Sequence, residues 1–387
     1  MKKRVLHFVR KSSQLKASFI YNQINNHIDF EPFIVYRKNL NKENKGGFAD
    51  FDYRKYPILD LSENETIAEE IRFKTDKKLS SRQIILILDF IRRNNIKICH
   101  FHYGTDCGVF YPILKMLKIP TVVSFYGYDC YSFPKSYFGF GQFYLKKRVF
   151  KHINNIIAMT PEMKKDLISA GCPKEKIIIH YHGIPSHLSS INRVYKQKRN
   201  LNLLMLSYFD PVKGHIFVFN ALKQLLNEGI SNFDLTIVGR GHYEQTLKSY
   251  IKDSRMEGNV HFANSVKYLS SQYFEKFTNA DIFLHPSVKT KQDKEGIPGS
   301  IVEAMFAGLP IISTYHGGIP YIIENERNGL LVKEWDTLGL EKAIKSLLSD
   351  NNKREALGQN GRSYATDLLD INLRERELEN IYTSIIN

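Results

Sequence analysis

This sequence has few cysteines, no long apolar runs and no excess of acidic residues, and each absence excludes a class of protein. Four cysteines occur in 387 residues and none belongs to a Cys-x-x-Cys pair, which argues against a disulfide framework or a cysteine-rich zinc site. No apolar stretch approaches the roughly 18 residues of a membrane-spanning helix. The opening stretch MKKRVLHFVRKSSQ holds only a short apolar run between charges, which predicts a buried strand and not a signal peptide. We therefore expect a cytoplasmic chain with reduced thiols.

Acidic residues are outnumbered by basic ones. Lys and Arg total 55 against 40 Asp and Glu, a formal net charge of +15. Such an excess favours an anionic partner such as nucleic acid, a phosphorylated ligand or an anionic membrane face, unless it only reflects a Lys-rich composition. No pattern typical of a nucleic-acid-binding module occurs, so we expect no nucleic-acid partner.

Strand-like and helix-like segments alternate along the chain. In the first half, apolar segments such as IKICHFHYG alternate with helical ones such as SSRQIILILDFIRRNN, where Ser80 and Gln83 are spaced as a capping box. The polar, basic stretch 186–200 is interpreted as a linker, after which the alternation restarts. This pattern predicts an α/β fold of two doubly wound, Rossmann-like domains that face a cleft. We place the domains at 1–190 and 191–370.

Glycines and polar residues of the second half follow directly after predicted strands. Lys213 and Gly214 follow LNLLMLSYF, and Gly239 and Arg240 follow FDLTIV. Two further loops follow the strands predicted in ADIFLHPS, after Leu284, and in LPIIST. Because parallel strands end at the same edge of a sheet, these loops should meet in one ligand site.

The stretch KEGIPGSIVEAMFAGLPIIST carries a glutamate on each side of a glycine loop, Glu295 and Glu303. Its glycines allow backbone amides to approach a ligand, and Pro298 stiffens the loop. The helix predicted from Gly299 offers free amides to a phosphate, while the carboxylates accept hydrogen bonds from hydroxyls. This is the chemistry of a nucleotide sugar, with Lys213 on its diphosphate. The alternative, an ordinary helical glutamate and an ordinary loop glutamate, explains neither the glycine loop nor Lys213.

The motif EGIPGSIVEAMFAGLPIISTYHGGIP resembles the donor-site signature of retaining glycosyltransferases with the GT-B fold, glycosyltransferase family 4. The resemblance spans nearly the whole chain. HFHYGTDCG and PTVVSFYGYD resemble the exopolysaccharide and lipopolysaccharide branch of that family. It implies transfer of a sugar, with retention and without metal or cofactor, from a UDP- or GDP-linked donor to a surface polysaccharide or lipid-linked glycan. It further implies an acceptor-binding first domain, completed by the tail helix 371–387, and a donor-binding second domain.

The resemblance also implies roles for single residues. Glu303 should bind the ribose, Glu295 the transferred sugar, and Lys213 the diphosphate, whose growing charge it would stabilise. Ala263 and Asn264 should lie near the base. The implied donor-binding set is Lys213, Gly214, Gly239, Arg240, Ala263, Asn264, Glu295, Gly296, Ile297, Pro298, Gly299, Ser300 and Glu303.

Several positions depart from the family pattern, among them Tyr321, where an acidic residue is usual, and the loop RKSSQLKAS, which lacks a glycine pair seen in some members. Ser207 and Tyr208 stand where the family often has Gly-Arg, so one diphosphate-binding cation is missing, for which Arg240 or Lys289 could substitute. Tyr126 stands where many relatives have a histidine with a catalytic role. A non-catalytic family member and a sugar-nucleotide epimerase of the same fold therefore remain alternatives.

The predicted catalytic set combines both halves of the chain: Glu295, Lys213, His102, Tyr126 and Asp129. His100 and His102 alternate on one predicted strand and share one face. His102, at the strand end, should face the cleft, and His100 should be a core histidine; a shared metal site is the alternative. Asp129 should orient Tyr126 or an acceptor hydroxyl, or else serve the turn after Gly127. Asp50 and Asp52 are interpreted as incidental surface residues, and no metal site is expected.

The segment CYSFPKSYFGFGQFYLKKRVFKH, residues 130–152, interleaves aromatic side chains with Lys146, Lys147, Arg148 and Lys151. This composition suits an anionic lipid surface, stacking on single-stranded nucleic acid, or a packed helix with a solvated basic face. We favour the lipid surface, because a lipid-linked glycan would be the acceptor. The protein would then be peripheral on the inner face of the cell membrane.

Overall fold

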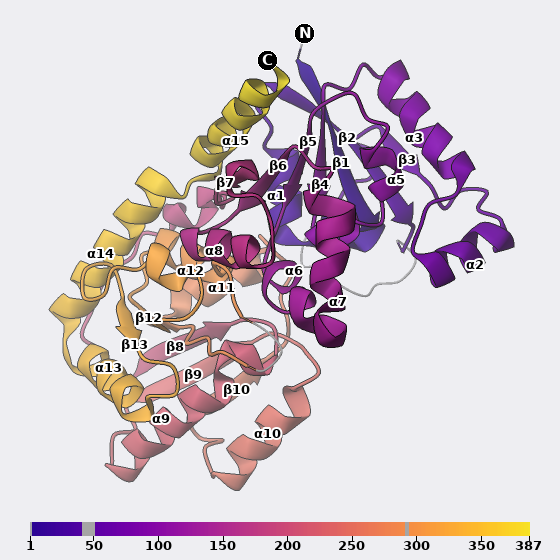
Figure 1. Cartoon of the computed structure of the whole chain (residues 1–387). Helices are drawn as coiled ribbons and strands as arrows, with labels where there is room; N and C mark the ends of the chain where they lie inside the picture. Colours follow the sequence, from indigo (N-terminus) through magenta and orange to yellow (C-terminus); the bar gives the residue numbers. More distant parts are fainter. Residues whose placement is uncertain (1, 41–50, 291–293) are drawn as a thin grey trace. The chain divides into compact units, whose positions relative to one another are not determined.

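The computed structural model describes residues 2–40, 51–290 and 294–387, which divide into two compact units (Figure 1). Unit 1 comprises Met1–Gly183 and Ile371–Asn387, and unit 2 comprises Ile184–Asp370. Each unit is built on its own parallel sheet, with strands and helices alternating along the chain. The predicted α/β fold with two doubly wound, Rossmann-like domains is confirmed.

Unit 1 contains a seven-stranded sheet in the order β3-β2-β1-β4-β5-β6-β7, in which all strand pairs are parallel. Its strands are β1 (Lys3–Lys11), β2 (Phe30–Lys38), β3 (Ile58–Asp60), β4 (Ile98–His102), β5 (Thr121–Ser124), β6 (Asn155–Ala158) and β7 (Ile177–Ile179). The strand order reverses between β1 and β4, and ligands of such sheets bind beyond the carboxyl ends at this point.

The helices of unit 1 are α1 (Ser18–Asn25), α2 (Ile67–Asp76), α3 (Ser81–Arg93), α4 (Gly104–Cys107), α5 (Tyr111–Leu114), α6 (Tyr128–Tyr131), α7 (Ser136–Leu145), α8 (Pro161–Ser169) and α15 (Ile371–Ile386). The capping box predicted for α3 is present, with Ser80 and Gln83 each bonding the other's backbone amide. The final helix, α15, packs against the strands of this unit (Figure 1). It shares a buried core with Val5, Phe30, Ile98, Val122 and Ile157 through Leu378 and Tyr382.

Unit 2 contains a six-stranded parallel sheet in the order β10-β9-β8-β11-β12-β13. Its strands are β8 (Leu201–Leu206), β9 (Phe233–Val238), β10 (Val260–Ala263), β11 (Ile282–Leu284), β12 (Ile311–Thr314) and β13 (Leu330–Val332). Its helices are α9 (His215–Asn227), α10 (Glu244–Asp253), α11 (Ser271–Asn279), α12 (Gly299–Phe306), α13 (Thr337–Ser349) and α14 (Asn351–Leu368). Apolar side chains of β8, β9 and α9 form the centre of one large core.

Two segments differ from the sequence-based expectation. Residues 130–152 contain the end of α6, a 3-10 turn (Phe133–Lys135), α7 and a π-helical turn (Lys146–Phe150). The expected linker 186–200 belongs to unit 2, where the Arg193 guanidinium donates to three backbone carbonyls, those of Phe277, Ala280 and Ala307.

Two further findings concern expectations about surface segments. Asp50 lies outside the described residues, and Asp52 is an exposed residue in an ion pair with Arg54. Within the described ranges, no helix combines the length and the apolar character needed to cross a bilayer.

Candidate functional site

The loops at the carboxyl ends of neighbouring strands in unit 2 contact one another. In the contact between the loops after β8 and β9, the Phe209 amide donates to the Arg240 carbonyl at 2.9 Å. In the contact between the loops after β8 and β11, the Val288 amide donates to the Val212 carbonyl at 2.8 Å. Gly214 allows this approach: its φ is +73°, and a Cβ there would lie 2.0 Å from the Pro286 carbonyl oxygen. The sheet thus gathers the predicted donor-site loops at one edge.

Lys213 and Glu295, 82 residues apart, form an ion pair at this edge. The Lys213 Nζ lies 2.5 and 2.6 Å from the two carboxylate oxygens of Glu295. The two side chains are only 18% and 15% exposed. Burial by itself raises the pKa of Glu295, but the Lys213 ammonium outweighs it and holds that pKa below its usual value. Two residues predicted to act on one ligand are therefore in direct contact.

The loop after β12 holds Glu295 in place. The Glu295 amide donates to His316 Nε2 at 2.9 Å, so His316 carries its proton on Nδ1 and donates it to Glu334 at 2.9 Å. Gly317, at φ +55°, lies so close that a Cβ would be 2.0 Å from the Glu295 carbonyl oxygen. We did not single out His316 or Gly317 from the sequence, because nothing in a loop motif shows which residue it will contact.

Helix α12 begins at Gly299, as predicted, with Pro298 preceding its first turn, and no side chain of the described residues caps it. Its first turn lies beside His285, whose Nδ1 is 3.3 Å from the Ser300 hydroxyl. Burial, with Lys213 nearby, lowers the pKa of His285 to about 3, so the ring is neutral at ordinary pH. Its Nε2 is buried and has no hydrogen-bond partner among the described residues. His285 is a second polar residue of this site that we did not predict.

Glu303 is a buried residue of α12, 7% exposed. Burial raises the pKa of Glu303 to about 7, and the neighbouring Tyr273 offsets only part of this rise. A buried carboxyl with a strongly raised pKa, beside loops that meet at one sheet edge, is typical of a functional site.

The remaining predicted donor-site residues lie along the same edge. Gly239 and Arg240 directly follow β9, Ala263 is the last residue of β10, and Asn264 follows it and is exposed. Since β9 and β10 pair in parallel, both loops leave the sheet on the same side.

In unit 1, the predicted catalytic residues His102 and Tyr126 are joined by a hydrogen bond of 2.7 Å between His102 Nδ1 and the Tyr126 hydroxyl. His102 is fully buried, whereas Tyr126 is partly exposed. His102, which we expected to face the ligand, lies under Tyr126 in this structure, so any influence on a ligand passes through Tyr126.

Asp129 connects the loops after β4 and β5. Its buried carboxylate accepts hydrogen bonds from the backbone amides of Gly104 at 2.8 Å, Tyr126 at 3.0 Å and Gly127 at 3.1 Å. Burial raises the pKa of Asp129 to about 6, and these amides limit the rise. Asp129 thus fixes the backbone of Tyr126.

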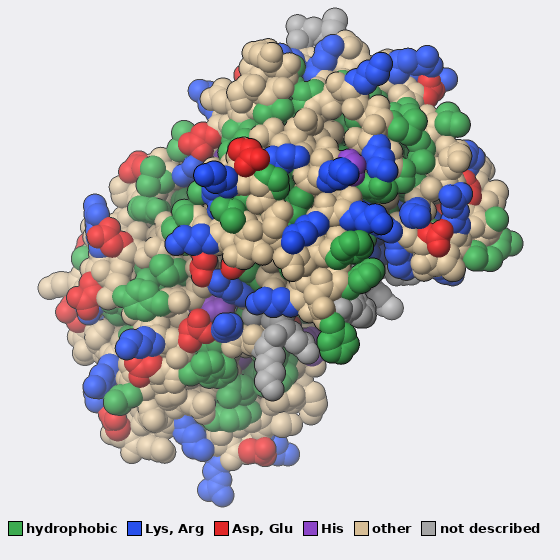
Figure 2. Space-filling model, in the orientation of Figure 1, with side chains coloured by type: hydrophobic (Ala, Val, Ile, Leu, Met, Phe, Trp, Pro, Cys, Tyr) green, Lys and Arg blue, Asp and Glu red, His purple; other side chains and the backbone are tan. Residues whose placement is uncertain are grey.

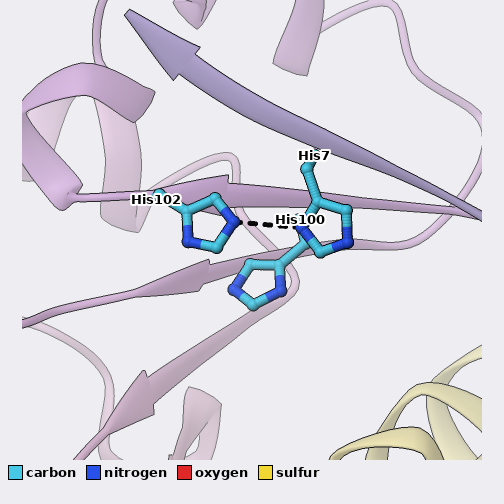
Figure 3. Close-up of side chains that lie close together, drawn as sticks. All are labelled: His7, His100 and His102. Carbon is cyan, nitrogen blue, oxygen red and sulfur yellow. Dashed lines mark hydrogen bonds between the residues drawn. The ribbon is translucent and has the colours of Figure 1, made fainter. Parts of the chain in front are cut away.

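Histidines 7, 100 and 102 converge in the interior of unit 1, with one ring nitrogen from each within 4.8 Å of the others (Figure 3). Every one of their six ring nitrogens already has a protein partner. His7 bonds to His27 and His102, His100 to Tyr382 and Ser124, and His102 to His7 and Tyr126. A metal ion would have to displace one of these partners at each ring, so the geometry favours a hydrogen-bonded cluster.

Comparison with known families divides the chain between residues 188 and 190, close to the boundary of the two units at Gly183 and Ile184. A sequence model described as "Glycosyltransferase Family 4" matches residues 60–188, and one described as "Glycosyl transferases group 1" matches residues 190–364. The amylovoran biosynthesis glycosyltransferase AmsK of Erwinia amylovora is 30% identical over 64% of this chain and 59% of its own length. A GDP-mannose-dependent mannosyltransferase of Mycobacterium tuberculosis is 27% identical over 47% of each chain. These matches span about half of the length of the curated relatives.

Solved structures share the fold along the whole chain. The Anabaena protein Alr3699/HepE, solved in complex with UDP and glucose, matches with a TM-score of 0.75 over 98% of this chain and 99% of its own, at 16% identity. A glycosyltransferase from Rickettsia africae matches with a TM-score of 0.78 over 100% of this chain and 99% of its own, at 17% identity.

Proposed function

Because the chain belongs to the glycosyltransferases of family 4 with the GT-B fold, we propose that it transfers a sugar, with retention of configuration, from a nucleotide-sugar donor to a surface polysaccharide or lipid-linked glycan. Unit 2 would bind the donor and unit 1 the acceptor. The proposed setting is the cytoplasmic side of the cell membrane, where such donors and lipid-linked acceptors meet.

The observation that carries this proposal is the Lys213–Glu295 ion pair beside the start of α12. A diphosphate would replace the Glu295 carboxylate as the partner of Lys213 and accept hydrogen bonds from the amides of Gly299 and Ser300 in the first turn of α12. Glu295, released from Lys213, would accept hydrogen bonds from the hydroxyls of the transferred sugar. Glu303 would accept those of the ribose.

The chemistry that follows is electrostatic. When the sugar–phosphate bond breaks, negative charge grows on the leaving diphosphate, and Lys213 with the helix amides would stabilise that charge. These groups supply the positive charge for which other enzymes use a metal ion, and the proposal therefore includes no metal or cofactor. His285, neutral and with a buried nitrogen that has no partner among the described residues, would add one hydrogen bond to the donor.

The nucleotide of the donor is proposed to be UDP or GDP. One structural neighbour was solved with UDP, and one relative is named for its use of GDP-mannose. The test is release of nucleoside diphosphate from a panel of UDP- and GDP-sugars by the wild type and by Lys213→Ala, with the exposed Lys342→Ala as control. The proposal predicts release with one donor class, its loss in Lys213→Ala only, and an α-anomeric product from an α-linked donor by NMR. Release that survives Lys213→Ala, or an inverted product, would contradict it.

We further propose that α7 contacts an anionic membrane. Phe138, Phe140 and Phe143 are 110%, 62% and 54% exposed, and the Lys147 Nζ lies 5.5 Å from the Phe143 ring centre. Apolar and basic side chains lie next to one another over the part of unit 1 that contains α7 (Figure 2). Exposed aromatic rings beside lysines suit the interface of an anionic bilayer.

Vesicle co-sedimentation tests the membrane contact. The protein should bind vesicles that contain phosphatidylglycerol more strongly than neutral phosphatidylcholine vesicles, and binding should fall in Phe138→Ser/Phe140→Ser and in Lys147→Glu. Ile85→Ser, which removes an apolar side chain that is 64% exposed on α3, is the matched control. Equal binding by all variants would refute a role for α7.

A further inference from the structure

A line of four hydrogen-bonded or ion-paired side chains crosses the interior of unit 1. His27, which follows α1, has its Nε2 2.8 Å from His7 Nε2. His7 Nδ1 lies 3.0 Å from His102 Nε2, the bond drawn in Figure 3. His102 Nδ1 lies 2.7 Å from the Tyr126 hydroxyl. The line therefore joins the sheet interior to the loop after β5.

The protons on this line can be arranged in only two ways. Each neutral imidazole donates from one nitrogen and accepts at the other. If His27 carries both ring protons, it donates to His7, His7 donates to His102, and His102 donates to the Tyr126 oxygen. If His27 is neutral and keeps its proton on Nδ1, every bond reverses, and Tyr126 donates to His102.

The Glu375 and Glu379 carboxylates beside His27 favour the first arrangement, in which His27 carries both ring protons. His27 Nδ1 lies 2.5 Å from a Glu375 oxygen and 3.3 Å from a Glu379 oxygen, and all three side chains are at most 5% exposed. Burial by itself lowers the pKa of His27, but these carboxylates raise it to about 9. Burial lowers the pKa of His7 and His102, which stay neutral. The ionisable groups that face His27 from α15, β1 and β4 are Glu375, Glu379, Tyr382, His7, His100 and His102.

We infer that the hydrogen bonds of the His27–His7–His102 line orient the Tyr126 hydroxyl so that it donates its proton to the ligand of unit 1. Because the Tyr126 oxygen accepts the proton of His102 Nδ1, its own proton points away from His102 and is available to a hydroxyl or phosphate oxygen. In this structure the Tyr126 hydroxyl also contacts the Ser124 hydroxyl, which lies 2.7 Å from His100 Nε2, so a ligand would have to take the place of Ser124 as the acceptor of the Tyr126 proton. Tyr126 is the group that touches the ligand, and the three histidines position its proton. The identity of that ligand as a glycosyl acceptor rests on the proposed function; the direction of the bonds does not.

The inference makes an unusual prediction about pH. When His27 loses its proton, at about pH 9, the whole line must reverse. His7 and His102 would each move their proton from Nδ1 to Nε2, although neither gains or loses charge. Three histidines would thus change together at one pH.

Nitrogen-15 NMR of labelled histidines in the full-length protein tests this directly, with signals assigned from single His→Asn variants. We expect His7 and His102 as Nδ1–H tautomers at about pH 7, and a joint change to Nε2–H with a midpoint near pH 9. Glu375→Gln should lower that midpoint by at least one pH unit, whereas His100→Asn, a neighbour outside the line, should leave it unchanged. An Nε2–H tautomer of His102 at pH 7, separate midpoints, or a stoichiometric zinc ion on the purified protein would each overturn the inference.

A transfer assay separates this inference from the proposed function. If the protein transfers sugar, the wild-type rate should fall as the pH rises through about 9, and Tyr126→Phe should give a low rate without that fall. A pH-dependent fall that persists in Tyr126→Phe would overturn the role of Tyr126. If no transfer is found at all, the proposed function fails, while the tautomers still report whether the line is polarised.

Discussion

Replacing Glu303 by glutamine should make unit 2 more stable while it weakens donor binding. Glu303 is 7% exposed, and burial raises its pKa from 4.5 to about 7. A carboxyl whose pKa is higher in the folded than in the unfolded protein stabilises the fold fully at a pH below the unfolded pKa. This stabilisation is lost as the pH rises through the folded pKa, here about 7. At about 1.4 kcal/mol per pKa unit, the ionised Glu303 should cost about 3 kcal/mol above pH 8. Glutamine keeps the shape and removes the charge, so this cost disappears.

Urea unfolding followed by tryptophan fluorescence measures the effect, because the chain has one tryptophan, Trp335, and it lies in unit 2. Glu303→Gln should exceed the wild type by up to about 3 kcal/mol at pH 8.5 and by little near pH 5. Glu275→Gln, at an exposed position of α11, should match the wild type at both. A Glu303→Gln variant that is less stable than the wild type at pH 8.5 would refute the reasoning, since protein contacts would then favour the ionised carboxylate.

Two further predictions concern stability. As the pH rises from 6.5 through 9, the wild type should lose about 3 kcal/mol of unfolding free energy, measured by circular dichroism in urea. The reason is that the pKa of His27 is raised in the folded protein, so His27 stabilises the fold only while it is protonated. An equal loss in Glu375→Gln would contradict this. Gly317→Ala should destabilise the protein in the same assay by at least about 2 kcal/mol more than Gly229→Ala. Both glycines have positive φ, but of the two only Gly317 would bring the new Cβ against a backbone atom, the Glu295 carbonyl oxygen at 2.0 Å. Equal losses of stability in the two variants would show that the loop moves to accommodate the methyl group.

The donor edge of unit 2 could be predicted from sequence because its signals are local. The glycines and Pro298 around Glu295 mark a loop, and the apolar run after Ser300 marks a helix, so α12 begins where predicted. Alternating strands and helices are enough to place all such loops at one sheet edge. That Lys213 and Glu295 meet as an ion pair required a contact across 82 residues, which no local pattern contains.

The histidine cluster of unit 1 shows why the rest could not be predicted. Strand alternation correctly places His100 and His102 on one face of β4. It does not reveal what covers that face, because His7 lies 95 residues from its partner His102 and Tyr382 lies 282 residues from its partner His100. His102 was therefore expected to reach a ligand, whereas the structure buries it beneath Tyr126.

The central claim, that the loops at the edge of unit 2 form a nucleotide-sugar site, is tested most directly by calorimetry. UDP, GDP and their common sugars would be titrated into the wild type, Lys213→Ala, Glu303→Ala and the exposed control Lys342→Ala. The account predicts saturable binding of one nucleotide class by the wild type and the control, weakened at least tenfold in each site variant. Folded wild-type protein that binds none of them, or site variants that bind as well as the control, would contradict it.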